Sequence, residues 1–556
     1  MWVADMTILK REKKYKDVSP EETVNRIRNL LDQYGIEISE KFFHIDTGDI
    51  NSCRICISNS NIAELNIGTN GKGMDINYTR ASAYGEFMER LANNMLLPKV
   101  TTNTEKLKLL EEEEARPYYQ RYFREVFGIN NKFEQYVEQR GEKVTMLEVD
   151  DVFNGTVTYL PIDYVETLCS SNGMCAGNTK EEALLQGISE IFERYAQYEI
   201  MMNNLTPPEI DRDFFASTGV KERLDELEKE GYKYRILDCS LGKGYPVIGL
   251  ELVFKGKYRI RLGSDPSPIT ALERCFTEIF QGHNVISEDL FVDIEDTRRE
   301  RAAFKGSDEA FRFTQYQLET INGSGCYPEE NVGGNAKPSY EFSGFEHPIS
   351  YSNEDDLNYY FDIIRRNGKH LYIADRSNMG FPVYFAVVPS LSEISIADDG
   401  TYYVNKLKNF ISSEAMSRIP FMNREELLEL AEKLEIWYAN YGAHWRNISS
   451  YFPPGLFASY HKYKMLSFLY ACGGNEEKAA EYLDRFLETT EGKYEPRLLN
   501  RRLVKEGKPE DCFPIDKWPI CPQCDECRAA SECRLKEVRL FNEQIVARIQ
   551  SFSIVK

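Results

Sequence analysis

A five-residue word that occurs twice carries most of the chemistry that this sequence offers. The letters EFMER begin at Glu86, and the related letters EIFER begin at Glu190. Positions i and i+3 share a face of a helix, so Glu86 pairs with Glu89, and Glu190 pairs with Glu193. Glu182 precedes the second copy at helical spacing and falls near the same face. The spacing therefore predicts carboxylates that are presented in pairs.

These carboxylates are separated by apolar residues such as Met88 and Phe192, so their helices must be partly buried. A lone copy would most simply be a salt-bridged surface helix. Several buried carboxylates need more positive charge than Arg90 and Arg194 supply. A third related segment adds Glu278 at helical spacing. Ligands that are all oxygen atoms favour Mg²⁺, whose shell is usually completed by phosphate oxygens.

A run of small and turn-forming residues precedes the second copy. Residues 170–179 read SSNGMCAGNT, and Thr179 stands three residues before Glu182, which is capping-box spacing. A glycine-containing loop that leads into a helix offers free N–H groups to an anion. Beside metal-type carboxylates, this loop favours a nucleoside triphosphate bound with magnesium. The sequence has no Walker A motif, kinase-like glycine loop or dinucleotide fingerprint, so the common nucleotide folds are disfavoured.

Taken together, these motifs resemble those of the YcaO family. The resemblance rests on SNGMCAGNT at residues 171–179 with the EIFER word, on ALER at 271–274, and on YIAD at 372–375 leading to Val388-Pro389. Order and approximate spacing agree over roughly residues 10–400. The resemblance implies a mixed α/β (α+β) fold with an internal repeat, which binds ATP differently from P-loop and kinase folds.

The resemblance also implies roles for individual residues. One magnesium ion would be held by Glu86, Glu190 and Glu193, and a second by Glu89, Glu182 and Glu278. Arg194 and Arg274 would face the phosphates, and the nucleotide would be contacted by Lys16, Thr23, Asn178 and Gln281. No single catalytic side chain is implied.

Members of this family activate a peptide backbone amide. A nucleophile adds to the amide carbon, and ATP phosphorylates the oxygen so that it can leave, which yields azolines or thioamides. The protein must mainly position ATP, neutralise its phosphates and align the amide. Azoline-forming members share a proline-rich extreme C-terminus, whereas this chain ends SIVK. Enterobacterial-type members are linked instead to methylthiolation of a small-subunit ribosomal protein, in which they assist a radical methylthiotransferase.

The resemblance thus predicts an ATP-hydrolysing enzyme of sulfur-related peptide or protein modification, either as an accessory to that methylthiolation or in thioamide formation. The expected partners are a peptide or protein substrate, a ribosomal protein, a radical methylthiotransferase and a second copy in a homodimer. The alternative is a non-catalytic scaffold or adaptor for the radical enzyme. The six matching glutamates favour the enzyme, because a scaffold has no physical reason to keep buried carboxylates.

Four cysteines form a separate motif near the C-terminus. Cys521, Cys524, Cys527 and Cys533 have the spacing C-x2-C-x2-C-x5-C, and Cys512 is a nearby fifth candidate. Two-residue spacers let thiolates converge on one metal, so we expect zinc or an iron–sulfur cluster. The alternative is a reduced, exposed tail or an internal disulfide. We favour the metal because four cysteines within thirteen residues rarely serve packing.

The chain around these motifs is organised in three parts. We expect an ATP-binding core at residues 1–405, a helical, tetratricopeptide-like region at 406–490 and a Cys-rich tail at 491–556. The clearest expected elements are helices at 19–34, 424–438, 456–470 and 476–488, with a break at residues 472–475, and strands at 233–237, 246–254 and 383–388.

Composition excludes some functions. The 556 residues include 68 basic and 89 acidic side chains, which gives a net charge of −21. This charge argues against direct DNA binding and against binding to an anionic membrane, because both need a cationic surface. The sequence contains no apolar run of membrane-spanning length and no signal-peptide pattern, so a cytoplasmic location is expected.

Overall fold

A computed structural model describes most of the chain. The described residues are 16–60, 62–97, 106–128, 144–286, 290–304, 306–334, 336–347, 352–394, 418–441, 462–488, 504–505, 508–512 and 534–553. Internal contacts divide the chain into two compact units, residues 1–395 with 545–556 and residues 396–544. All of the predicted nucleotide and magnesium residues belong to the first unit.

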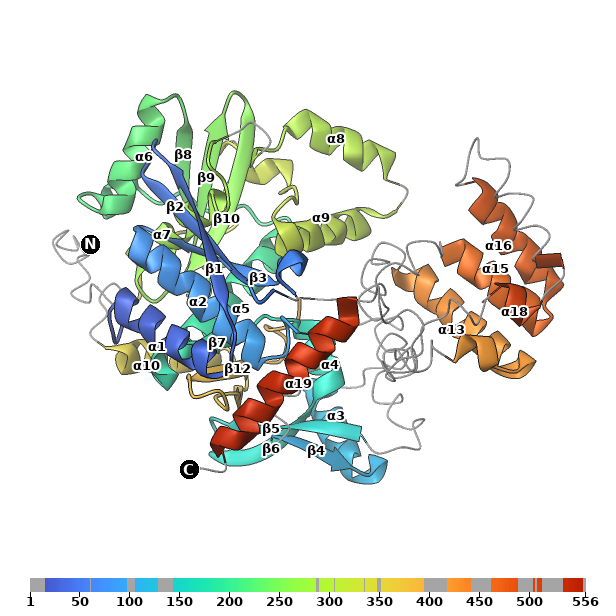
Figure 1. Ribbon diagram of the computed structural model, residues 1–556. Helices are drawn as coiled ribbons and strands as arrows, with labels where there is room; N and C mark the ends of the chain where they lie inside the picture. The colour runs from blue at the N-terminus through green and yellow to red at the C-terminus, as the bar shows by residue number, and fades with distance from the viewer. Residues whose placement is uncertain are drawn as a thin grey trace. The chain divides into compact units, whose positions relative to one another are not determined.

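The first unit contains two antiparallel three-stranded sheets, each followed by a helix (Figure 1). The first sheet has the order β1-β2-β3 and is followed by α2; the second has the order β10-β9-β8 and is followed by α7. Their bounds are β1 Ile38–Ile45, β2 Ile50–Ile57, β3 Gly68–Gly73, α2 Ile76–Ala92, β8 Lys233–Asp238, β9 Val247–Phe254, β10 Lys257–Ser264 and α7 Pro268–Ile279. Helix α2 packs on β2 and β3, and α7 packs on β9 and β10.

A six-stranded antiparallel sheet completes the strands of this unit. Its order is β4-β5-β11-β12-β7, and β6 pairs with β5. The strands are β4 Leu107–Leu110, β5 Val144–Asp151, β6 Thr156–Pro161, β7 Met174–Ala176, β11 Tyr372–Asp375 and β12 Val383–Val387. The other helices of the unit are α1 Pro20–Gln33, α3 Glu112–Phe127, α4 Ile162–Cys169, α5 Lys180–Met202, α6 Gly219–Lys229, α8 Ile294–Ala303, α9 Asp308–Asn322 and α10 Asn353–Arg366.

Helix α5 joins two of these sheets into one core. It contacts β7 and β12 of the six-stranded sheet and also β9 and β10 of the second three-stranded sheet. Its Ile188, Ile191 and Phe192 are fully buried in the main apolar cluster. Thr179 caps its N-terminus and accepts a hydrogen bond from the Glu182 backbone N–H at 3.2 Å, as the capping-box spacing predicts. The position of α5 therefore brings the EIFER word into the centre of the unit.

Glycines allow strands β3 and β10 to pack flat against the helices that follow them. A Cβ added at Gly71 would lie 2.1 Å from the Thr79 carbonyl oxygen, and one added at Gly263 would lie 2.4 Å from that of Ala271. In both cases the obstructing carbonyl lies eight residues after the glycine, so the two strand–helix units have the same local geometry. Any larger side chain would push the helix away from its strand.

The strand–helix unit formed by β7 and α5 has the same kind of close contact, but here the glycine lies on the helix and the cysteine on the strand. A Cβ added at Gly187 would lie 2.9 Å from the Cys175 Sγ atom, and Gly187 follows Cys175 by twelve residues, as Cys275 follows Gly263. Fifteen residues after Gly71, Cys175 and Gly263 come Glu86, Glu190 and Glu278. The internal repeat is thus a threefold strand–helix unit that places one glutamate at an equivalent position on each helix.

Most of the expected elements are present with small shifts at their ends. The predicted helix at 19–34 is α1, the three predicted strands are β8, β9 and β12, and the mixed α/β class is confirmed. The second unit contains the helices α13 Arg424–Tyr441, α15 Lys462–Gly473, α16 Glu476–Glu488 and α18 Pro509–Cys512. Gly474, at φ +86°, lies in the predicted break between α15 and α16. The start of the predicted helix at 456–470 lies outside the described residues.

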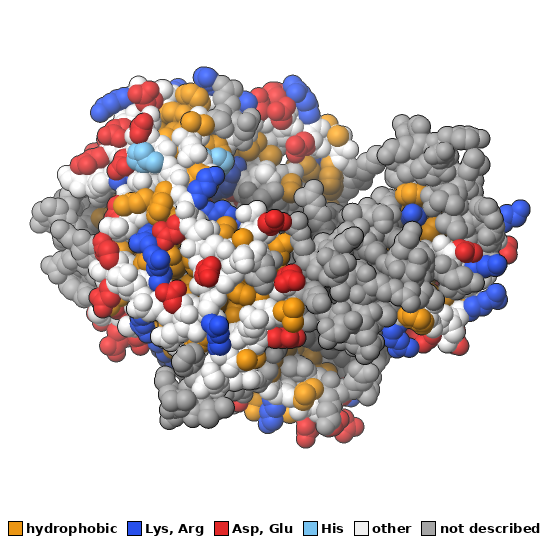
Figure 2. All heavy atoms as spheres, viewed as in Figure 1, with side chains coloured by type: hydrophobic (Ala, Val, Ile, Leu, Met, Phe, Trp, Pro, Cys, Tyr) orange, Lys and Arg blue, Asp and Glu red, His pale blue; other side chains and the backbone are white. Residues whose placement is uncertain are grey.

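Helices α13, α15 and α16 pack in sequence around their own apolar core, which includes Leu430, Leu469 and Tyr482. The final described helix is α19 Arg534–Ser553, whose last residues, from Ile545, are assigned to the first unit. Among the described helices, none is both long enough and apolar enough to span a bilayer. Acidic and basic side chains are intermixed on the face of the molecule in Figure 2.

Candidate nucleotide and magnesium site

The two EFMER-type words lie on α2 and α5 with their carboxylates beside one another. On α2, the Arg90 Nε atom lies 3.7 Å from Glu86 Oε1 and 3.5 Å from Glu89 Oε1. On α5, the Arg194 Nε atom lies 4.0 Å from Glu190 Oε1. Each arginine therefore pairs within its own word, as the spacing predicts.

Electrostatics shows that the carboxylates of the two helices converge. Burial, together with the neighbouring Glu190 carboxylate, raises the pKa of Glu86, and the same causes raise the pKa of Glu89 well above its usual value. Burial and Glu190 also raise the pKa of Glu193, although Arg194 and Lys72 oppose that shift. Glu89 is only 7% exposed. Burial and mutual repulsion both disfavour the charged forms of these acids, and a nearby cation would favour them.

Helix α7 adds the third part of this cluster. Glu278 forms an ion pair with Lys72 of β3. Arg274 lies 3.2 Å from Asp265, measured from Nη2 to Oδ2, and its charge acts on Glu193. Gln281 follows the end of α7 in a half-buried turn. In the repeat it corresponds to Glu89, because Gln281 follows Gly263 by the same number of residues as Glu89 follows Gly71. We call Glu86, Glu89, Glu190, Glu193 and Glu278 the acidic cluster.

A second group of predicted residues surrounds Glu182 at the start of α5. Its carboxylate accepts hydrogen bonds from the Asp17 backbone N–H at 3.0 Å and from Asn178 Nδ2 at 3.1 Å, and Lys16 Nζ lies 3.8 Å away. Asn178 also contacts the Thr23 hydroxyl of α1, at 3.0 Å from Nδ2 to Oγ1. The structure therefore brings together Lys16, Thr23, Asn178 and Glu182, which are as far apart as 166 positions in the sequence.

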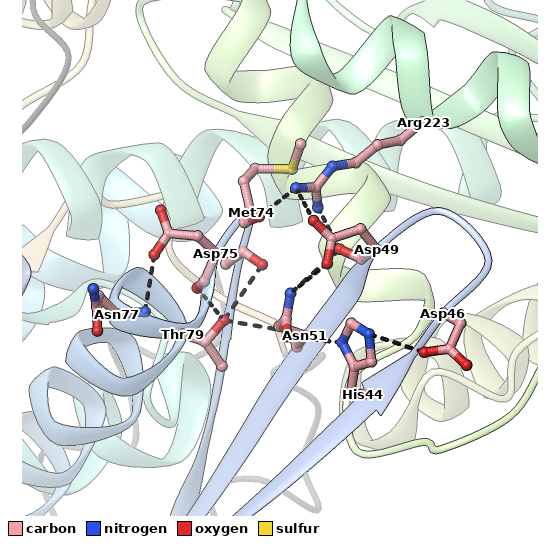
Figure 3. Close-up of polar contacts among 10 residues, drawn as sticks. His44, Asp46, Asp49, Asn51, Met74, Asp75, Asn77, Thr79 and Arg223 are labelled. Carbon is pink, nitrogen blue, oxygen red and sulfur yellow. Dashed lines mark hydrogen bonds and ion pairs between the residues drawn. The ribbon is translucent and has the colours of Figure 1, made fainter.

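The loop before α2 is held by a polar network that Figure 3 shows in close-up. Arg223 of α6 donates to the Met74 carbonyl at 2.6 Å and to Asp49 Oδ2 at 3.0 Å. Thr79 donates to the Asp75 carbonyl at 2.7 Å. His44 belongs to the same network and contacts Asn51 at 2.9 Å between Nδ1 and Oδ1. These contacts fix the start of α2, and with it the direction in which Glu86 and Glu89 extend.

The donor set fits a hard divalent cation bound with phosphate. Carboxylate oxygens are the ligands that Mg²⁺ prefers, and the raised pKa values show that the acidic cluster would gain from additional positive charge. Among the described residues, no three Asp, Glu, His or Cys side chains already form a metal-ligand group. In the acidic cluster, the carboxylates of Glu278, Glu86 and Glu190 pair instead with Lys72, Arg90 and Arg194, respectively.

Comparison with known proteins identifies this arrangement. A sequence model of the family described as YcaO cyclodehydratase, ATP- and Mg²⁺-binding, matches residues 70–392, which is more than half of the chain. The chain belongs to the YcaO family. The match spans the acidic cluster and Asn178, so α2, α5, α7 and the loop before α5 lie in the part that defines the family.

Relatives of the chain extend this finding. It is 26% identical over 454 residues to the Escherichia coli ribosomal protein S12 methylthiotransferase accessory factor YcaO, and the match covers 76% of this chain and 73% of that protein. It is 29% identical over 426 residues to an uncharacterized Haemophilus influenzae protein, covering 70% of this chain and 68% of the other.

Two solved structures are also similar to this chain. The YcaO protein of Methanopyrus kandleri bound with AMPPCP and Mg²⁺ matches at a TM-score of 0.43 and 18% identity, over 68% of this chain and 92% of that one. A heterocyclase in complex with substrate and cofactor matches at a TM-score of 0.47 and 18% identity, over 69% of this chain. This chain spans about half of that heterocyclase, at 53%.

Sequence reasoning missed two residues of the site, Lys72 and Asp265. Lys72 is the second-last residue of β3, Asp265 directly follows β10, and neither belongs to a helical pattern. The signal that could have revealed Lys72 is the Gly-Lys-Gly sequence fifteen residues before the EFMER word, which places a lone charge in a tightly packed strand. The cysteines Cys521, Cys524, Cys527 and Cys533 lie outside the described residues, and Cys512 is buried in the second unit.

Proposed function

We propose that this YcaO protein is an ATP- and Mg²⁺-dependent enzyme that activates a backbone amide by phosphorylation. When bound, ATP would supply the phosphoryl group that turns the amide oxygen into a leaving group. The observation that carries the proposal is the convergence of carboxylates from three helices, Glu89 buried and the others half-buried, around Lys72 and two arginines. Without a metal ion or nucleotide, Lys72, Arg90 and Arg194 would compensate only part of the negative charge of these five carboxylates.

Each group of residues has a task in this proposal. Glu86, Glu190 and Glu193 would hold one Mg²⁺, and Glu89, Glu182 and Glu278 a second. Arg194 and Arg274 would orient the phosphates, while Lys16, Thr23, Asn178 and Gln281 would hold the nucleotide. The chain would then act by positioning and charge neutralisation, which are the main requirements of phosphoryl transfer.

The modification is proposed to be sulfur-related, with a protein as its target. The name of the Escherichia coli relative connects that protein to methylthiolation of ribosomal protein S12, and this chain matches most of its length. We infer a similar accessory role with a radical methylthiotransferase, and thioamide formation as the second possibility. Mass spectrometry of ribosomal protein S12 from cells with and without this gene tests the first role, which fails if the methylthio group persists without the gene.

Magnesium-dependent ATP hydrolysis tests the enzymatic proposal directly. Glu193→Gln removes one charge of the acidic cluster. Glu199→Gln on the same helix is the matched control, since Glu199 lies outside the acidic cluster and accepts a hydrogen bond from Asn203. We expect Glu193→Gln to lower the rate at least about a hundredfold, a loss typical of removing one electrostatic contact of a transition state. Equal rates in the two variants, or no nucleotide binding by the wild type, would overturn the proposal.

A further inference from the structure

Two arginines lie together on strand β10. Arg259 and Arg261 are separated by one residue, so their side chains extend to the same face of the strand. They also converge on one point of the chain. A Cβ added at Gly323, which ends α9, would overlap the Arg261 Nη2 atom and lie 3.0 Å from Arg259 Nη2. The two guanidinium groups are therefore side by side at the C-terminal end of α9.

Only one of these two guanidinium groups is paired with a carboxylate among the described residues. Arg261 forms an ion pair with Glu319 of α9 and donates from Nη2 to the Gly323 carbonyl at 2.8 Å. The Arg259 Nε atom is buried and has no hydrogen-bond partner in the described part of the chain. Burial lowers the pKa of Arg259 to about 10, and no described carboxylate acts against that shift. Arg259 thus remains charged at neutral pH without a counter-ion there.

The acidic cluster acts on this pair. Burial and the Arg259 charge lower the pKa of Arg261, and so does Arg194 of α5. Glu193 and the Tyr327 hydroxyl raise it. Because Glu193 belongs to the acidic cluster, the two arginines lie within electrostatic reach of the place where magnesium is proposed to bind.

An exposed loop lies near the same pair. His283 follows α7 and is exposed, and the Arg259 charge adds to burial in lowering the pKa of His283. Arg259 itself is only half-buried. The pair therefore extends from the acidic cluster to the surface, as a subsite for a substrate requires.

We propose that Arg259 and Arg261 form a subsite for a carboxylate side chain of the peptide substrate. The inference rests on the proposed function for the amide chemistry and adds a substrate class to it, a peptide with an acidic residue at or next to the activated amide. The planar guanidinium group of arginine matches the two oxygens of a carboxylate, so Arg259 can take the substrate group while Arg261 keeps Glu319.

The charge at this place favours a carboxylate over a phosphate. Two guanidinium groups and the Glu319 carboxylate leave one net positive charge, 2 − 1 = +1, which a singly charged carboxylate balances. The C-terminal end of α9 adds partial negative charge, so a phosphate dianion would leave an excess of negative charge. In the proposed function the nucleotide phosphates are oriented by Arg194 and Arg274 instead.

Two blocked tripeptides that differ in one group test this subsite, acetyl-Gly-Asp-Gly-amide and acetyl-Gly-Asn-Gly-amide. Their dissociation constants for the full chain are measured by ligand-observed NMR in MgCl₂, with and without AMPPCP. We expect the wild type to bind the Asp peptide at least about tenfold more tightly, since a hydrogen bond to a charged group contributes about that factor.

Three variants make the test decisive. Arg259→Met should lose the preference for Asp without a fall in melting temperature, because no described carboxylate loses a partner. Arg259→Lys keeps the charge but not the planar group, and should lower the preference severalfold. Arg235→Met on β8 of the same sheet is the control. Arg235 pairs with Glu209 at 3.0 Å and with Glu251 at 2.8 Å, so this variant should melt at a lower temperature and keep the preference.

The remaining outcomes separate this inference from the proposed function. Equal affinities of the wild type for the two peptides, no binding of the Asp peptide at millimolar concentration, or a preference that Arg259→Met retains would overturn the inference. If Arg259→Met instead weakens AMPPCP binding and leaves the peptides unchanged, Arg259 is a nucleotide ligand and the subsite is wrong. If the wild type prefers the Asp peptide through Arg259 but binds no AMPPCP, the carboxylate subsite stands and the proposed function is wrong.

Discussion

Replacement of Glu393 by glutamine should prevent a loss of stability that the first unit undergoes as the pH rises. Glu393 follows β12, and its Oε1 atom accepts a hydrogen bond from the Tyr122 hydroxyl of α3 at 3.0 Å. Its Oε2 atom is buried and has no hydrogen-bond partner among the described residues. Burial raises the pKa of Glu393 from 4.5 to about 7, although Tyr122 and Lys369 oppose the shift.

The sign follows from the protonation states. The folded chain holds the Glu393 proton up to about pH 7, whereas the unfolded chain releases it near pH 4.5. The stabilising contribution is therefore complete below the unfolded pKa and is lost as the pH rises through the folded pKa. The difference between the two pKa values corresponds to about 3 kcal/mol, or roughly 300-fold in a local opening equilibrium.

Hydrogen exchange followed by mass spectrometry measures this effect in peptides that contain Tyr122 or residue 393. At pH 5 wild type and Glu393→Gln should be similarly protected, since glutamine can still accept from Tyr122. At pH 8 the variant should be better protected, by up to about 300-fold. Comparison at equal pH cancels the intrinsic exchange rate, and Glu226→Gln, an exposed site on α6, is the control. Equal protection of wild type and Glu393→Gln at both pH values would refute the reasoning.

Three further predictions concern the repeat, the nucleotide group and the C-terminal cysteines. Gly263→Ala should destabilise the first unit by about 1–3 kcal/mol, because the added Cβ would lie 2.4 Å from the Ala271 carbonyl oxygen. Gly85→Ala is the control and should be neutral or slightly stabilising, because a Cβ there has nothing within 4 Å. Urea unfolding compares the two variants, and equal effects would contradict the close-packing argument. Asn178→Ala should lower the free energy of unfolding by about 1–3 kcal/mol, because the Glu182 carboxylate and the Thr23 hydroxyl each lose a hydrogen-bond partner. It should also weaken AMPPCP binding, and calorimetry measures both effects. Unchanged stability and binding would count against the predicted role of Asn178. Metal analysis of anaerobically purified protein should find zinc or iron that is lost when Cys524 and Cys527 are both changed to serine, and a metal-free wild type would remove this prediction.

Local sequence signals were sufficient for much of the fold and for the glutamates of the site. Helical periodicity placed Glu86 with Glu89 and Glu190 with Glu193, because residues three apart share a face whatever surrounds the helix. Thr179 was identified as a helix cap for the same reason, since its hydrogen bond closes within three residues. The break at Gly474 also follows from local backbone preference. The resemblance to YcaO proteins then connected these separate patterns to ATP and magnesium.

Tertiary structure alone decided which of these groups meet and which charges oppose them. The contact between Thr23 and Asn178, the ion pair of Lys72 with Glu278 and the burial of Glu393 beside Tyr122 all join residues more than 150 positions apart. Such contacts leave no periodic trace, because they depend on how sheets and helices pack rather than on spacing along the chain. The sequence by itself therefore determined the carboxylates and the helices that carry them. Packing decided that Lys72 lies among these carboxylates. Gly71 and Gly73 let β3 approach α2 closely, and the side chain of Lys72 between them extends to Glu278.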